Sequence, residues 1–284
     1  MQKYIVDHII RVYYLKLGAL ALRLKNDYDK TVIHHFRVDV KKMRAFYRLL
    51  SLEAGHGKQL KLPRKLKKMY RYAGVTRDIQ LQIKNVADYT QKEDAGLHRL
   101  QSLLEHRRKR LDKKNKHILS KSYFLRQERK ALEQAPLQLR AETLQLFFRQ
   151  KKEAIARVIA KGRFSTVGLH SIRKSMKDIL YVTSIYTEEI HSSLPLLFWK
   201  NNELKEMEDL AHELGRHNDI SNTLVLLKSA AAGFTGKALQ NTLAYYRHLE
   251  NEKKELRNKL VARLSSPPVF LSPGAWRLHP VIDQ

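Results

Sequence analysis

Apolar residues recur at intervals of three and four positions along nearly all of this 284-residue chain, and this spacing is typical of one face of an α-helix. Glycine (11 residues) and proline (7 residues) are scarce, which disfavours folds that depend on many tight turns. We therefore predict an all-α fold. The predicted helices cover about residues 1–24, 31–53, 59–73, 77–90, 94–134, 138–162, 166–190, 194–214, 218–231 and 236–264, and we expect an interruption within 94–134.

A short pattern of residues occurs twice in the same order, which indicates that a helical unit has been duplicated. The first copy consists of His34, Arg37, Lys41, Gly74 and Asp78, and the second consists of His170, Arg173, Lys177, Gly215 and Asp219. Pro136 lies between two polar stretches and is a suitable boundary between the copies. We predict a single domain at 1–264, with halves at about 1–135 and 136–264, followed by an irregular, proline-containing tail at 265–284.

The chain is strongly basic, with 55 lysines and arginines against 28 aspartates and glutamates and a formal net charge of +27. A compact domain with this excess repels itself, so the charge indicates a partner of opposite sign. Nucleic acid, an anionic membrane and inorganic polyphosphate all have the required charge. Selection for solubility is the alternative explanation, although clustering of the cations disfavours it.

Composition and motifs also limit the chemistry. The chain has no cysteine, which excludes disulfides, zinc fingers and thiol catalysis. No signal peptide and no apolar stretch long enough to span a bilayer is apparent, so we expect a cytoplasmic protein that is not bound to membranes. His212 and His217 resemble a zinc-protease pair but are five residues apart rather than four. No phosphate-binding glycine loop or nucleophile motif is present, so we expect neither catalysis nor a metal or cofactor.

One predicted helix carries a stripe of five basic side chains. At about 100° per residue, all five lie within roughly 80° of arc. Apolar residues such as Val40 and Ala45 border the stripe on both sides, whereas a stripe that faces open water usually has polar borders. The pattern therefore favours a basic groove or pore between packed helices over a solvated face. The stripe consists of His34, Arg37, Lys41, Arg44 and Arg48.

The charge pattern is stronger in the first half of the chain. His170, Arg173 and Lys177 repeat the stripe, but Leu180 occupies the position that corresponds to Arg44. The following helix of the first half adds Arg64, Lys68 and Arg71 on one face, whereas its counterpart at 200–214 is acidic. We therefore expect the second half to contribute less to anion binding.

The two glycine–aspartate units have two interpretations. Gly74 and Gly215 suit the left-handed residue that ends a helix, and Asp78 and Asp219 suit the first turn of the next one. This capping role is the principal expectation. The alternative is that these units orient an arginine of the groove. A third basic cluster, at 99–130 and including 107–110 and 113–114, is either a solvated helix or an outer landing surface for an anionic polymer.

The run His34-x-x-Arg37-x-x-x-Lys41-Lys42-x-Arg44, its echo from His170 to Tyr181 and the two glycine–aspartate units resemble the CHAD family. The resemblance covers about residues 1–264. It implies two four-helix bundles that are related by pseudo-two-fold symmetry around a basic central pore or groove. It also implies binding of inorganic polyphosphate and association with polyphosphate granules. Leu180 departs from the family pattern, as does Lys174 at a usually apolar position.

These considerations predict a non-catalytic, polyphosphate-binding protein. RNA binding is the alternative function, with nucleic acid expected to be the weaker competitor because the stripe carries no aromatic residue for stacking bases. Nothing in the pattern indicates an oligomeric state. The predicted polyphosphate-binding residues are His34, Arg37, Lys41, Lys42, Arg44, Arg48, Arg64, Lys68, Arg71, His170, Arg173 and Lys177.

Overall fold

The computed structural model describes residues 1–26, 29–55, 59–93, 97–114, 120–193, 195, 198–266 and 269–271. Within these ranges the chain forms nine α-helices and no strand, so the predicted all-α class is confirmed. A π-helical turn, η1, covers Ile185–Glu189, and a 3-10 turn, η3, covers Val269–Leu271. The α-helices are α1 (Lys3–Asn26), α2 (Lys30–Glu53), α3 (Arg64–Glu93), α4 (His98–Lys114), α5 (Lys121–Gln134), α6 (Ala141–Ala160), α7 (Thr166–Ser184), α8 (Asn201–Ala231) and α9 (Gly236–Ser265).

Two helices continue through glycines at which breaks were predicted. Helix α3 joins the predicted helices 59–73 and 77–90 through Gly74, and α8 joins 194–214 and 218–231 through Gly215. Neither glycine has the positive φ of a helix-ending residue. The predicted helix 94–134 is interrupted, as expected, and forms α4 and α5. The capping role predicted for the two glycine–aspartate units is therefore wrong.

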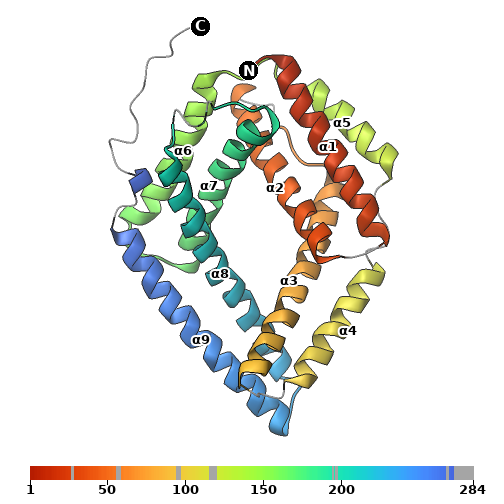
Figure 1. The fold of residues 1–284 in the computed structure, drawn as a ribbon, viewed down its shortest axis with the longest axis vertical. Coiled ribbons are helices and arrows are strands. Elements are labelled where there is room, and N and C mark those ends of the chain that lie inside the picture. The colour runs from red at the N-terminus through yellow and green to blue at the C-terminus, as the bar shows by residue number, and fades with distance from the viewer. Residues whose placement is uncertain are drawn as a thin grey trace.

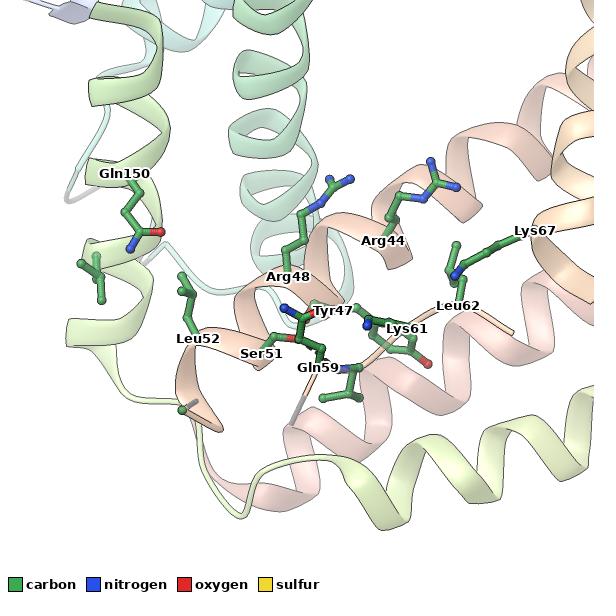
Figure 2. A pocket seen from close by; sticks show the side chains of 13 residues that line it. Arg44, Tyr47, Arg48, Ser51, Leu52, Gln59, Lys61, Leu62, Lys67 and Gln150 are labelled. Atoms are coloured by element: carbon green, nitrogen blue, oxygen red, sulfur yellow. Dashed lines mark hydrogen bonds between the residues drawn. The ribbon is translucent and has the colours of Figure 1, made fainter. Parts of the chain in front are cut away.

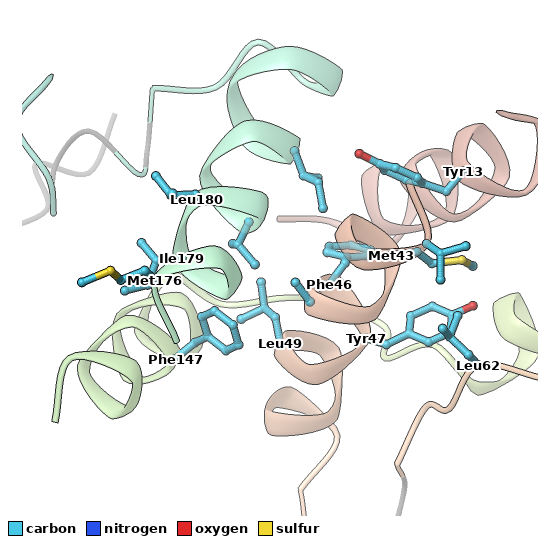
Figure 3. Close-up of a cluster of buried hydrophobic side chains, with 14 of the residues drawn as sticks. Tyr13, Met43, Phe46, Tyr47, Leu49, Leu62, Phe147, Met176, Ile179 and Leu180 are labelled. Carbon is cyan, nitrogen blue, oxygen red and sulfur yellow. The ribbon is translucent and has the colours of Figure 1, made fainter. Parts of the chain in front are cut away.

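The larger hydrophobic core joins helices from both predicted halves of the chain. Figure 3 shows Leu49 of α2 beside Phe147 of α6, with Ile179 of α7 in the same cluster. Helix α2 packs directly against α7. The two basic helices predicted from the repeat are therefore neighbours in space.

A second hydrophobic core joins the C-terminal parts of α3 and α8. Ile79 and Val86 of α3 pack there with Leu104 of α4, Leu227 of α8 and Tyr245 of α9. Figure 1 shows the consequence: α2 and α3 border one side of the centre of the molecule, and α7 and α8 border the other. The four helices that carry the repeated residues thus surround a common centre.

The described part of the C-terminal segment follows α9, and Phe270 in η3 is fully buried in the larger core. The remainder of the predicted tail, 267–268 and 272–284, lies outside the described residues. None of the described helices combines the length and the apolar character needed to cross a bilayer.

Candidate functional site

Helix α2 holds the basic stripe between two buried borders. The helix begins after Asp29, whose carboxylate accepts hydrogen bonds from the backbone N–H groups of Thr31 (2.8 Å) and Val32 (2.9 Å). The border residues Val40 and Ala45 are fully buried. His34 is exposed, and the other four stripe residues are half-buried. The stripe therefore lies in a recess and not on an open face.

Tyr70 of α3 holds two arginines of the stripe. The guanidinium carbons of Arg37 and Arg44 lie 4.9 Å and 4.8 Å from the centre of the Tyr70 ring, within the range of a cation–π interaction. Arg37 Nη1 also donates a hydrogen bond to the Tyr70 carbonyl oxygen (3.3 Å). Tyr70 was not among the predicted site residues, because it belongs to a different helix from the stripe. Its position four residues before Gly74, one helical turn away, was the available signal.

The glycine of each repeat lies against the arginine of the same repeat. A Cβ atom on Gly74 would overlap the guanidinium group of Arg37, and a Cβ atom on Gly215 would lie 3.3 Å from Nε of Arg173. Both glycines are buried within helices. Their role is to make room for an arginine from the adjacent helix, which agrees with the alternative interpretation of the glycine–aspartate units.

Cations from α2 and α7 converge on Lys41. Burial and the charges of Arg37, Arg173 and Lys177 together lower the pKa of Lys41 to about 8. The carboxylates of Asp219 and Asp78 act in the opposite direction. Burial and the Arg173 charge likewise lower the pKa of Lys177. Such mutual repulsion disfavours the charged state, and a bound anion would relieve it.

The same cationic centre extends to α3 and to the first histidine of the repeat. Burial lowers the pKa of His34, and the next largest contribution is the charge of Arg77. Burial and the charge of Arg37 lower the pKa of Arg77 itself. Arg77, which lies between Gly74 and Asp78 and was not among the predicted binding residues, therefore belongs to the site.

Two carboxylates share this space with the cations. Protein surrounds Asp78 closely enough to raise the pKa of its carboxyl group, although water still reaches the side chain. Arg37 lowers the pKa of Asp78, and Asp219 raises it. Asp78 and Asp219 each lie one helical turn after the glycine of their repeat, and they face a common recess from α3 and α8.

Some arginine donors in the site have no acceptor. Nε of Arg173 and Nη1 of Arg77 are shielded from solvent, and neither donates a hydrogen bond to any residue in the described ranges. Buried donors are normally satisfied, so these N–H groups are available to an anionic ligand.

The structure separates several predicted residues from this centre. Arg48 forms an ion pair with Asp178 of α7 (2.5 Å), and Lys151 of α6 contacts the same carboxylate (2.8 Å). Lys42 pairs with Glu188 of η1 (2.6 Å). These interactions join helices within the fold and occupy charges that were expected to face the ligand.

Leu180 explains why the second copy of the stripe is shorter. Its side chain packs in the larger core, so the position matching Arg44 does not face the groove. Lys174, the other departure from the family pattern, is exposed to solvent. The remaining predicted cations are all exposed on their helices; they are Arg64, Lys68, Arg71 and His170.

The described residues contain no group of three or more histidine, aspartate or glutamate side chains that could hold a metal ion. The site is built from arginine and lysine side chains, with His34 and two aspartates at its edges. Such a set can bind phosphate oxygens through several charge-assisted hydrogen bonds at once.

The fold and the clustered cations define an all-helical protein with a basic internal surface. The CHAD domain model matches residues 16–228, so the chain belongs to the CHAD domain family. No curated protein sequence matches the chain. The crystal structure of the CHAD domain from the plant Ricinus communis is similar, with a TM-score of 0.65 and 16% sequence identity over 95% of this chain and 89% of that chain. At this identity the similarity establishes the fold.

Proposed function

We propose that the protein binds inorganic polyphosphate, without catalysis, in the recess between α2, α3, α7 and α8. The observation that supports this function best is the position of Lys41. Its amine is half-buried and interacts with Arg37, Arg173 and Lys177. These four cations outnumber the two carboxylates near Lys41, those of Asp78 and Asp219. A fold gains nothing from such a concentration of like charge unless an anion neutralises it.

The proposed mechanism is multidentate. Arginine guanidinium groups bind phosphate oxygens through paired N–H donors, and lysine amines add point charges. Arg37 is already oriented by Tyr70 and Gly74, so binding needs little further ordering of its side chain. Release of counterions from the polymer makes the affinity strongly dependent on salt.

The arrangement of two four-helix bundles about a pseudo-two-fold axis is part of the same proposal. The equivalent contacts of Arg37 with Gly74 and of Arg173 with Gly215 support it. So does the pairing of α2 with α7 in the larger core. Location in the cytoplasm, on polyphosphate granules, follows from the proposed ligand.

RNA is the competing ligand, and Tyr70 is the observation that favours it, because an aromatic ring beside cations is a common platform for bases. Two guanidinium groups already stack on Tyr70, so we expect polyphosphate to bind more tightly. Immobilised protein loaded with labelled long-chain polyphosphate should retain it against single-stranded RNA at equal phosphate concentration and moderate salt. Efficient displacement by RNA would reverse the assignment.

Affinity for polyphosphate should fall as the pH rises above 8. A bound anion favours the charged amine of Lys41 and so raises its pKa above the value of about 8 in the free protein. Below pH 8 the amine is already charged before binding. Above pH 8 the free protein must take up a proton on binding, and this requirement lowers the affinity. If the pKa of Lys41 in the complex returns to its usual value of 10.5, the affinity for polyphosphate falls about tenfold between pH 7 and pH 9. Anisotropy of labelled polyphosphate at constant ionic strength measures this dependence.

Lys41→Arg provides the control, because arginine stays charged throughout this range. The variant should bind with nearly the same affinity at both pH values. An equally steep fall in Lys41→Arg would show that another group is responsible.

A further inference from the structure

A cleft of about 810 Å³ lies beside the proposed groove, at the C-terminal end of α2. The segment 59–62, the first turn of α3 and the middle of α6 complete its walls (Figure 2). Arg44 lines the cleft and also stacks on Tyr70 in the groove. The cleft and the groove are therefore adjacent and share one cation.

The rim of the cleft is basic. Arg44, Arg48, Lys61 and Lys67 line it, and among the described residues no acidic side chain does. Lys61 and Lys67 are exposed and form no ion pair with any part of the chain that the structure describes. In contrast to Arg48, which is paired with Asp178, these two lysines are available to a ligand.

The floor of the cleft is apolar. Tyr47, Leu60 and Leu62 are buried side chains that line it, together with the partly buried Leu52 and Leu146. Inorganic polyphosphate consists only of phosphorus and oxygen and has no apolar part, so it gains nothing from contact with this floor. A ligand that gains from both floor and rim has an apolar or aromatic body and a phosphate group.

Hydrogen bonds hold the cleft in its observed shape. The backbone N–H of Leu60 donates to Oγ of Ser51 (3.1 Å), and that hydroxyl donates to the carbonyl oxygen of Tyr47 (2.7 Å). The hydroxyl of Tyr47 donates to that of Tyr14 within the core (3.2 Å). The segment that forms one wall is thus fixed to α2.

We propose that this cleft is a second binding site, for an organic phosphate whose aromatic body lies on the leucine floor and whose phosphates contact Lys61, Lys67 and Arg44. Its volume is within the usual range of small-molecule sites. Because Arg44 belongs to both sites, occupation of the cleft weakens polyphosphate binding in the groove. This last consequence rests on the proposed function, whereas binding in the cleft does not.

Titration calorimetry with ATP and with inorganic triphosphate, both without divalent metal, tests the proposal. The two probes carry similar charge, but only ATP has a body that can occupy the apolar floor. We expect ATP to bind about tenfold more tightly or better. Equal affinity for the two probes would overturn the proposal.

Substitutions locate the site. Lys61→Glu with Lys67→Glu should lower ATP affinity by about tenfold or more, whereas Lys65→Glu with Lys84→Glu, exposed positions on α3 that do not line the cleft, should change it little. Leu146→Ser should bring the affinity for ATP close to that for triphosphate. An unchanged ATP affinity in the Lys61/Lys67 variant would contradict the assignment.

Binding of labelled long-chain polyphosphate to the same proteins separates the two proposals. A wild-type protein that binds polyphosphate but not ATP would overturn the cleft site alone. One that binds ATP in the cleft but not polyphosphate would overturn the proposed function alone. If both ligands bind, saturating ATP should lower the affinity for polyphosphate, and Arg44→Gln should reduce this coupling.

Discussion

Arg37→Glu combined with Arg44→Glu is expected to lower the affinity for long-chain polyphosphate by about 100-fold or more at moderate salt. The change removes two guanidinium groups that Tyr70 orients and places two carboxylates in the recess. The slope of log affinity against log salt should also become shallower by roughly one to two, because fewer phosphates are neutralised. Anisotropy titrations over a series of salt concentrations measure both quantities.

The control variant carries the same change in charge on α4. Arg107 and Lys109 are exposed, and Arg107→Glu with Lys109→Glu should weaken binding only a few-fold through the net charge of the protein. Arg108 is less suitable because it pairs with Glu105 (3.0 Å). Equal losses in both variants would indicate a diffuse basic surface and no groove. Arg173→Glu should have an intermediate effect, provided that thermal unfolding confirms that all variants are folded.

The basic stripe was predictable because it depends on one helix. Side chains three and four residues apart share a face whatever the rest of the chain does, and the apolar borders showed that this face lies in a recess. Val40 and Ala45 are indeed buried. The all-α class follows from the same local periodicity.

The role of Gly74 could not be read from its own helix. A glycine between two polar helical stretches suits both a helix end and a close contact with another element. What decides between these roles is Arg37, which approaches from α2. The repeat pairs an arginine with a glycine in both copies, which was a sign that the two residues act together. That they touch became clear only from the packing of α2 against α3.

The ion pairs that remove cations from the site were also beyond sequence reasoning. Arg48 and its partner Asp178 are 130 residues apart, and Lys42 and Glu188 are 146 residues apart. The sequence places Arg48 on the same face as Lys41, but two turns further along the helix this face meets a carboxylate of α7, that of Asp178. Helical periodicity describes the direction of a side chain and not the element that it meets.

Gly74→Ala is expected to weaken polyphosphate binding by about tenfold while leaving the thermal unfolding temperature unchanged or raising it. Alanine in place of glycine within a helix stabilises it by about 1 kcal/mol. The new methyl group would overlap the end of the Arg37 side chain, which is flexible and can move away. The fold thus keeps its stability while Arg37 loses its contacts with Tyr70. Thermal unfolding and anisotropy on the same protein sample measure the two effects.

Gly215→Ala is the matched control because it makes the same substitution in the equivalent helix. There the added Cβ atom would lie 3.3 Å and 3.5 Å from Nε and Nη2 of Arg173, so a displacement of a few tenths of an ångström relieves the contact. We expect a similar gain in helix stability and a loss of affinity of about threefold or less. A stable Gly74→Ala protein with full affinity would show that the position of Arg37 does not matter for binding. Equal losses in the two variants would mean that the two halves contribute equally, in contrast to the asymmetry seen at Arg44 and Leu180.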